Sequence, residues 1–253
     1  MHEQALAGRV AIVTGGAQSI GAAIADGLAA AGATVVVADL QDSPDHANIR
    51  LDVSDESQVI NCIDAVVAEH GRLDIIVNNA GIMFETAINE QDLESWNRML
   101  AINLTGPMLM SKHAAPHLAA TGHGSIVNIG SIEGDRCNPH HAAYAATKSG
   151  VHGMTRAVAV DLGPDSTRCN AIAPGWINTP LNASYVDDAA DPDAVVEALE
   201  ALHPIGRIGA TTDVADVAVW LAGDASKFVT GQVITVDGGR TARPPLPSLA
   251  DNR

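Results

Sequence analysis

Residues 10–21 read VAIVTGGAQSIG: an apolar run, then a turn rich in glycine, then the start of a helical pattern. An apolar run without polar alternation is typical of a strand buried on both faces. Glycines after such a strand let a phosphate approach the backbone, and the next helix supplies amide donors and a partial positive charge. We expect these loop residues to line a nucleotide site: Gly15, Gln18, Ser19, Ile20 and Gly21. Ser19 adds a hydroxyl at the helix start, which either caps the helix, as serine does well, or bonds a phosphate oxygen.

The same alternation of strand and helix continues along the chain. Apolar runs occupy 10–15, 34–40, 49–53, 73–81, 124–131, 168–175 and 232–239. Helical patterns lie between them, at 20–31, 55–70, 92–118, 142–162 and 212–222. Alternating strands and helices predict parallel strands joined by right-handed crossovers. The sequence therefore predicts an α/β protein with a single-domain, doubly wound (Rossmann) fold, in which a seven-stranded parallel sheet carries helices on both faces.

Two segments interrupt this rhythm. Residues 182–207 form a long acidic insertion whose second half reads as helical. A long excursion near strand ends is a candidate substrate lid, although a plain surface hairpin of helices is the alternative. Residues 241–253 form a Pro-rich C-terminal tail that we expect to leave the core. Residues 1–253 otherwise read as one domain.

Composition narrows the class of protein. The net charge is −16, so the surface should repel nucleic acid, and we take the acidity as a solubility feature. Cys62, Cys137 and Cys169 show neither a CxxC spacing nor even pairing, as suits the reducing cytoplasm. The sequence shows no secretory signal, and no apolar run has the ~20 residues that cross a bilayer, so no membrane association is expected.

Asp39 ends the second apolar run, where a carboxylate can accept both hydroxyls of an adenosine ribose. It would repel a 2′-phosphate, and no Arg or Lys lies between Ala33 and His46 to neutralise one. The loop and Asp39 together favour NAD over NADP. The alternative is an ordinary acidic residue at a strand end.

Tyr144 and Lys148 stand four residues apart on a predicted helix and so share one of its faces. The chain has only two tyrosines, and a Tyr-x-x-x-Lys pair is expected by chance about 0.02 times in such a chain. Ser131 ends the preceding strand and so lies at the carboxyl edge of the sheet, where ligands bind. These three residues are the candidate chemical centre.

An ordered set of motifs resembles the short-chain dehydrogenase/reductase family from Gly8 to about Gly239. In chain order it consists of the loop 14–21, Asp39, LDV with Asp52, NNAG at 78–81, Asn103, Ser131, Tyr144 with Lys148, and PGWINTP at 174–180. Ser19 departs from the pattern, because this family usually has glycine there. The resemblance implies the Rossmann fold and a nicotinamide cofactor.

The resemblance also implies the role of each catalytic residue. Tyr144 is the general acid/base, Ser131 bonds the substrate oxygen, and Lys148 holds the nicotinamide ribose. Asn103 anchors a water that passes protons from Lys148 toward solvent; an ordinary helix-interior asparagine is the alternative. Because a free phenol has a pKa of about 10, we expect the Lys148 ammonium and the oxidised nicotinamide to lower the pKa of Tyr144.

The resemblance implies further cofactor contacts beyond the loop. Asp52 and Val53 are expected to bracket the adenine, and Ile177 and Thr179 to hold the carboxamide of the nicotinamide. The full set of remaining contacts is Leu40, Asp52, Val53, Asn79, Ala80, Gly81, Pro174, Gly175, Ile177 and Thr179.

The substrate pocket is expected from 132–138, 83–85, Trp176 and the insertion after Leu181. Its mixture of apolar and charged residues does not choose among a cyclic alcohol, a sugar, a steroid-like ring and an acyl thioester. Glu133 is a candidate partner for a polar group of the substrate. The histidines show no metal-ligand spacing, and we take His140, His141 and His152 as surface or packing residues.

The sequence therefore predicts an NAD(H)-dependent oxidoreductase that interconverts a secondary alcohol and a ketone. A 3-oxoacyl-thioester reductase of the acyl carrier protein type is one alternative, and an NAD-binding sensor without turnover is another. We also expect a homotetramer, because the resemblance implies assembly through the helices predicted at 92–118 and 142–162 and through the last strand.

Overall fold

The computed structural model describes residues 4–187 and 189–242, and their strands form one seven-stranded sheet. The strands are β1 Val10–Thr14, β2 Thr34–Asp39, β3 Ala47–Arg50, β4 Ile75–Asn78, β5 Ser125–Ile129, β6 Arg168–Pro174 and β7 Val233–Val236. Their order in the sheet is β3-β2-β1-β4-β5-β6-β7, and every neighbouring pair is parallel. The predicted Rossmann fold is confirmed. The order reverses between β1 and β4, which is where such sheets bind ligands, beyond the carboxyl ends of the strands.

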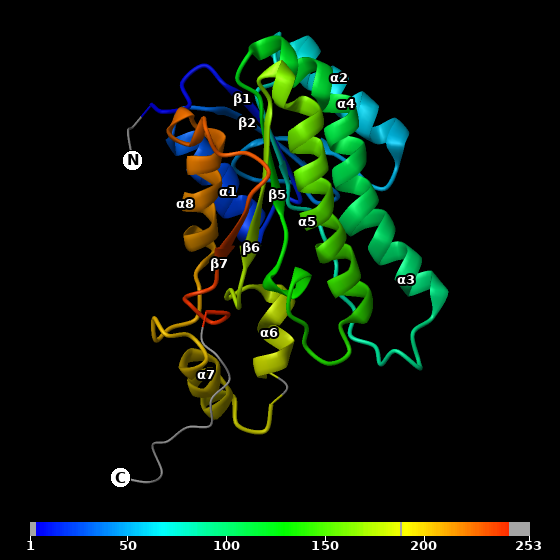
Figure 1. The fold of residues 1–253 in the computed structure, drawn as a ribbon, viewed down its shortest axis with the longest axis vertical. Helices are drawn as coiled ribbons and strands as arrows, with labels where there is room; N and C mark the ends of the chain where they lie inside the picture. The colour runs from blue at the N-terminus through cyan, green and yellow to red at the C-terminus, as the bar shows by residue number, and fades with distance from the viewer. Residues whose placement is uncertain (1–3, 188, 243–253) are drawn as a thin grey trace.

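Helices cover both faces of the sheet (Figure 1). Helices α1 Ser19–Ala30 and α8 Thr211–Ala222 pack together on one face. Helices α2 Glu56–His70, α4 Gly106–Thr121 and α5 Ala142–Leu162 lie on the other. The strands are apolar on both sides because alternate residues point to opposite faces, and both faces are covered.

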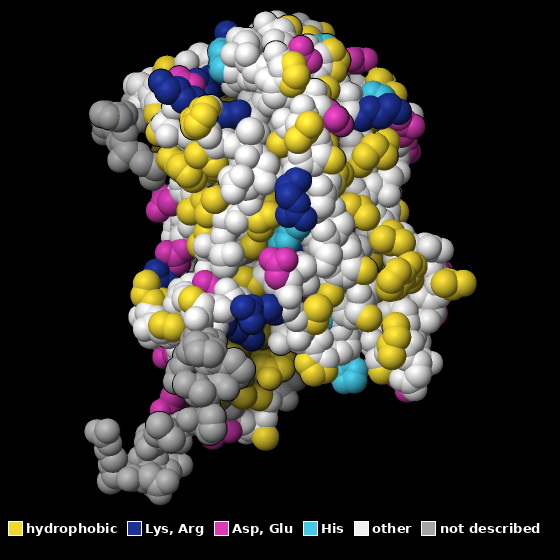
Figure 2. Space-filling model, viewed as in Figure 1, with side chains coloured by type: hydrophobic (Ala, Val, Ile, Leu, Met, Phe, Trp, Pro, Cys, Tyr) yellow, Lys and Arg dark blue, Asp and Glu magenta, His cyan; other side chains and the backbone are white. Residues whose placement is uncertain are grey.

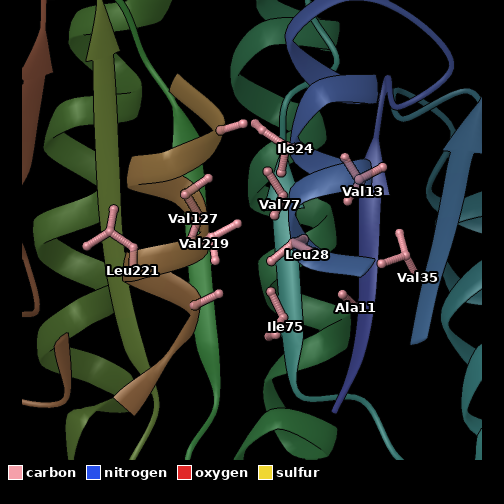
Figure 3. Close-up of a cluster of buried hydrophobic side chains, with 14 of the residues drawn as sticks. Ala11, Val13, Ile24, Leu28, Val35, Ile75, Val77, Val127, Val219 and Leu221 are labelled. Atoms are coloured by element: carbon pink, nitrogen blue, oxygen red, sulfur yellow. The ribbon is translucent and has the colours of Figure 1, made fainter. Parts of the chain in front are cut away.

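Two buried clusters show this alternation. Figure 3 shows Ala11, Val13, Ile75, Val77 and Val127 of the strands packed against Ile24 and Leu28 of α1 and Val219 and Leu221 of α8. The intervening strand residues Ile12, Ile76 and Ile126 join the opposite cluster, with side chains from α2 and α4. Burial of these clusters holds the strand ends in fixed positions.

The predicted helix over 92–118 is interrupted. Helix α3 Leu93–Leu100 passes into a five-residue π-helical turn, Ala101–Thr105, before α4 begins. Periodicity does not reveal such a turn, because it adds one residue to the hydrogen-bond spacing without ending the helix. Asn103 lies at the centre of it.

Several strands are shorter than their apolar runs. β4 ends at Asn78 although the run reaches Gly81, and β7 ends at Val236 although the run reaches Gly239. β3 is shifted to Ala47–Arg50. The residues past the strand ends turn toward the open edge of the sheet, so much of the predicted strand there is site-forming loop.

The insertion consists of two helices, α6 Pro180–Asp187 and α7 Pro192–Ala201, so the first half is helical as well as the second. Asp191 caps α7 by accepting a hydrogen bond from the Ala194 amide at 3.1 Å. Both helices lie beyond the end of the sheet, at the bottom of Figure 1. Of the predicted tail, residues 243–253 lie outside the described residues.

Candidate active site

A cavity of about 1320 Å³ opens at the carboxyl ends of the strands. Ligand pockets commonly have volumes of about 300–1,000 Å³, so this one has room for a dinucleotide together with a small substrate. Its wall contains nearly every predicted site residue: Gly15, Gln18, Ser19, Ile20, Gly21, Asp39, Leu40, Asp52, Val53, Asn79, Ala80, Gly81, Ser131, Tyr144, Lys148, Pro174, Gly175, Ile177 and Thr179. Asn103 is the exception and lies behind the wall.

The glycine loop is fastened to the end of β4. The Asn79 side-chain amide donates to the carbonyls of Thr14 at 3.1 Å and Gly15 at 2.7 Å. The Thr14 hydroxyl accepts from the amides of Asn79 and Ala80 at 3.0 and 3.2 Å. A Cβ on Gly15 would lie 2.8 Å from the Ala80 Cα, and one on Gly21 would collide with the Gly15 carbonyl oxygen. These two glycines are therefore required for the loop to close.

Ser19 does not cap α1, so one of the two roles predicted for its hydroxyl is wrong. Gln18 holds the N-cap position, and Ser19 is the first helical residue with a φ of +57°. That left-handed conformation is costly for a residue with a Cβ and easy for glycine. The structure thus gives the physical reason why glycine would suit position 19 better.

The end of the cavity lined by Asp39 and Asp52 is acidic, and both carboxylates are held by hydrogen bonds. The Asp39 carboxylate accepts the amides of Ala17 and Gln41, each at 3.0 Å. Asp52 accepts the amide and hydroxyl of Ser54 at 2.9 and 2.7 Å. A carboxylate has about four acceptor sites, so both acids keep capacity for further donors.

At the opposite end, the segment after β6 forms the floor of the cavity. The Gly175 amide donates to the Val236 carbonyl at 2.9 Å, and a Cβ on Gly175 would lie 2.7 Å from the Asp237 Cβ. Ile177 pairs with Gly209 in an isolated bridge, and Thr179 is buried. The close packing fixes this segment against the loop after β7.

Tyr144 and Lys148 project from the same face of α5 toward Ser131. The Lys148 Nζ lies 5.5 Å from the centroid of the Tyr144 ring and donates to the Ile129 carbonyl at 2.8 Å. The Ser131 hydroxyl accepts the Glu133 amide at 3.1 Å and so keeps its own proton available for donation. The three side chains predicted as the chemical centre meet at one point of the cavity wall.

Burial shifts the pKa values of both Tyr144 and Lys148. Burial raises the pKa of Tyr144 to about 12, while a hydrogen bond from Ser131 lowers it and the charge of Glu133 raises it further. Burial also lowers the pKa of Lys148 to about 8. In the protein alone, loss of hydration therefore dominates and opposes ionisation of the phenol. The expected lowering by the Lys148 ammonium together with the oxidised nicotinamide stays a prediction for the site with its cofactor.

Asn103 is fully engaged behind the cavity. Its side-chain oxygen accepts the Ile82 amide at 2.8 Å, and its side-chain nitrogen donates to the Ile82 carbonyl at 2.8 Å and to the Thr147 hydroxyl at 3.3 Å. A Cβ on Gly81 would lie 3.4 Å from the Asn103 Oδ1 and 3.8 Å from the Lys148 Nζ. Asn103 thus holds the segment after β4 close to Lys148.

His141 and Glu133 form a buried pair that the sequence reasoning did not identify. The His141 Nδ1 lies 2.7 Å from a Glu133 carboxylate oxygen, and the Asn138 side chain donates to the other oxygen at 2.8 Å. Both members of the pair line the cavity, and the His141 ring meets the Tyr144 ring edge-on at 6.3 Å between centroids. Glu133 is therefore already hydrogen-bonded within the cavity wall. The only signals of the pair in the sequence are that Glu133 lies two residues after Ser131 and that His141 comes directly before α5.

His152 is confirmed as a packing residue: it is buried against Gly130 and Gly134. His140 lies in the cavity wall with a φ of +66°.

The substrate side of the cavity combines predicted and unpredicted residues. Met83, Ile132 and Trp176 line it as predicted, and Tyr185 of α6 packs against Trp176 at 5.2 Å between centroids. The predicted insertion contributes Asn182, Leu199 and Leu202 to the wall, whereas Arg98 and Arg240 line the cavity without having been predicted. Phe84 and Asp135 do not line it.

Phe84 instead lies beneath the Arg98 guanidinium, 5.9 Å from ring centroid to Cζ. In the part of the chain that is described, no group of acidic, His or Cys side chains could hold a metal ion. Within the same residues, no helix is long and apolar enough to cross a bilayer.

Comparison with known proteins gives consistent relatives. A family model described as enoyl-(acyl carrier protein) reductase matches residues 15–241. Cis-4-hydroxycyclohexanecarboxylate dehydrogenase of Sinomonas cyclohexanicum is 41% identical over 252 residues, with 94% of this chain and 99% of that protein covered.

Two solved structures superpose over nearly the whole chain. Ligand-free aldohexose dehydrogenase of Thermoplasma acidophilum gives a TM-score of 0.92 at 33% identity, with 97% of this chain and 98% of that chain covered. A gluconate 5-dehydrogenase of Burkholderia cenocepacia, in complex with NADP and tartrate, gives 0.88 at 34% identity, with 96% and 99% covered. Both solved structures share the fold of this chain over almost its whole length.

Proposed function

Because the chain belongs to the short-chain dehydrogenase/reductase family, we propose that it interconverts a secondary alcohol and a ketone with NAD as its dinucleotide. The family makes the chain an oxidoreductase. The observation that carries the proposal is that Ser131, Tyr144 and Lys148 meet in the wall of a cavity large enough for cofactor and substrate.

The residues of the cavity fit a dinucleotide. The loop that closes through Gly15 and Gly21 exposes backbone amides at the start of α1, which suits a pyrophosphate. Asp52, Val53, Ile177 and Thr179 line the cavity, which supports their proposed roles: the first two would bracket the adenine and the last two would hold the carboxamide. NAD, when bound, supplies the acceptor for the hydride that the carbinol carbon loses in oxidation.

Asp39 supports NAD over NADP. Its carboxylate is fixed at the cavity wall by two amides and, among the described residues, forms no ion pair. A 2′-phosphate placed beside it would meet uncompensated negative charge, whereas ribose hydroxyls would find free acceptor sites. Because one of the solved relatives binds NADP, the preference of this chain for NAD is to be measured directly against NADP.

Tyr144 takes the proton in oxidation and returns it in reduction. Ser131 donates a hydrogen bond to the same substrate oxygen and stabilises the charge that develops there. Burial keeps the phenol neutral by default, so Tyr144 starts as an acid for ketone reduction. For oxidation its proton must leave through Lys148. Asn103 fixes the segment of Ile82 on the other side of Gly81, and its anchoring of a relay water is proposed on the family resemblance alone.

The substrate we propose is a small cyclic or polyhydroxylated secondary alcohol. The relatives named above act on a hydroxycyclohexane carboxylate, an aldohexose and a gluconate, as their names state. Trp176, Tyr185 and Leu202 give an apolar wall for a ring. Helices α6 and α7 carry part of that wall, and we propose that they act as its lid.

The second candidate function is reduction of a 3-oxoacyl thioester, which the description of the matching family model favours. Such a reductase usually takes NADP, and Asp39 opposes that cofactor. A sensor without turnover would not need Ser131, Tyr144 and Lys148 together at one point.

We propose a homotetramer as the assembled form, in the cytoplasm that the three unpaired cysteines suit. Figure 2 shows hydrophobic side chains gathered on the surface over α3. Leu93 at its start is 76% exposed, and Val160 of α5 is 76% exposed. Exposed apolar groups on these helices support an interface there.

The test is a panel of secondary alcohols and ketones, each measured with NAD and with NADP. Oxidation of a cyclic alcohol or a sugar acid with NAD supports the proposal. Reduction of acetoacetyl thioester with NADP alone would favour the second function, and cofactor binding without turnover of any compound would favour the sensor.

A further inference from the structure

A second cavity of about 250 Å³ adjoins the substrate side of the main one. The two share Ile132, Glu133, Asn138 and Arg240 in their walls. Arg136, Cys137 and Thr241 complete the smaller cavity, which we call the arginine annex. Since Glu133 follows Ser131 by two residues and its amide bonds the Ser131 hydroxyl at 3.1 Å, the annex opens beside the proposed reaction centre.

Arg240 is held at this place by a tight turn around Asp237. The Asp237 carboxylate accepts the amides of Gly239 at 2.9 Å and Thr241 at 2.7 Å, and the Thr241 hydroxyl at 2.7 Å. Burial opposes ionisation of Asp237, but the hydrogen bonds from Thr241 and Gly239 outweigh it and lower its pKa. Because Asp237 packs on Gly175, the turn places Arg240 next to the floor of the main cavity.

The acid in the annex wall is already bonded. Glu133 accepts hydrogen bonds from Asn138 at 2.8 Å and pairs with His141 at 2.7 Å. Neither Arg136 nor Arg240 makes an ion pair with any described residue. The annex wall therefore contains two arginines without an ion pair among the described residues and one carboxylate, Glu133, that is already engaged by Asn138 and His141.

Two arginines, Arg136 and Arg240, in the wall of one small cavity are unusual for this chain, which has 14 Lys and Arg against 30 Asp and Glu. A guanidinium carries donors in a planar fork that matches a carboxylate in a bidentate arrangement. We propose that the annex binds a carboxylate of the substrate, so that the substrate is a hydroxy acid whose carbinol lies at Ser131 and Tyr144. This inference rests on the proposed function and narrows its substrate class.

The binding test needs no turnover. Calorimetry would measure the affinity of cyclohexanecarboxylate and of its uncharged counterpart, cyclohexanecarboxamide, for the NAD-loaded wild type and for Arg240→Gln, Arg136→Gln and Arg156→Gln. Arg156 lies on the exposed side of α5 and is the matched control. We expect the carboxylate to bind at least about tenfold more tightly than the amide, and each annex variant to lose most of that preference. The Arg156 variant should keep it.

Kinetics with 4-hydroxycyclohexanecarboxylate, its carboxamide and cyclohexanol separate the two claims. Oxidation of cyclohexanol and of both derivatives with equal kcat/KM would leave the proposed function standing and overturn the annex. Equal calorimetric affinities for carboxylate and amide, or a preference that survives in both annex variants, would also overturn it. Carboxylate-selective binding without turnover of any alcohol would support the annex and count against the proposed function.

Discussion

Ser19→Gly is expected to make the protein more stable and to improve its use of NAD. Ser19 begins α1 at a φ of +57°, a conformation that costs a residue with a Cβ about 1–2 kcal/mol. Glycine loses more backbone entropy on folding, which cancels about 0.5–1 kcal/mol of the gain. The net stabilisation should be about 0.5–1 kcal/mol, or about 1–4 °C in melting temperature for a chain of this size.

Ser166 offers a matched control, because it has the same φ of +57° in an exposed turn after α5. Ser166→Gly should raise the melting temperature by a similar amount. Position 19 alone lines the cavity, so the KM for NAD should fall in Ser19→Gly and stay constant in Ser166→Gly. Differential scanning fluorimetry and steady-state kinetics measure both effects. A melting temperature that does not rise in either variant, or a KM that changes equally in both, would refute the reasoning.

Three further results are expected. Burial raises the pKa of Tyr144 to about 12, so its phenol stays protonated near neutrality. The kcat for ketone reduction should therefore change little between pH 6 and pH 8, whereas the kcat for alcohol oxidation should rise with pH. An oxidation kcat that does not change with pH would contradict this. Burial lowers the pKa of Lys148 from 10.5 to about 8, so keeping its ammonium in the folded protein lowers the free energy of unfolding below pH 8. In urea unfolding, the free energy of unfolding of the wild type should rise by up to about 3 kcal/mol between pH 8 and 10.5 relative to that of Lys148→Met. The same pH dependence in both proteins would exclude this effect of Lys148. Asp39→Asn should raise the ratio of kcat/KM with NADP to that with NAD at least about tenfold, and an unchanged ratio would disprove the role of the carboxylate.

Much of the architecture was predictable because strand and helix patterns are local. The run at 142–162 predicted α5 to the residue, and Tyr144 with Lys148 was placed correctly on one face. Strand ends were less predictable, since Gly81 and Gly239 belong to apolar runs but lie beyond the strand ends, and Gly81 lines the cavity. The pattern of apolar residues does not distinguish the last residue of a strand from a residue in the loop that follows it and lines the site.

What the sequence did not predict depends on contacts that form only in the folded chain. The Asn103 side chain in the π-helical turn bonds Ile82, 21 residues earlier, and Glu133 meets His141, eight residues later, where the chain leads into α5. The protonation of Tyr144 depends on how completely the fold buries it, which residue spacing does not encode. The φ of Ser19 likewise follows from closure of the glycine loop onto β4.

The central claim is that the Tyr144 hydroxyl transfers the proton in the interconversion of alcohol and ketone. Single-turnover oxidation of a panel alcohol, measured at saturating NAD in the wild type and in Tyr144→Phe, tests it most directly. We predict that the variant binds NAD with the wild-type affinity while the rate of NADH formation falls by at least about 10²-fold. A rate within a few-fold of the wild type, with NAD binding intact, would contradict the account.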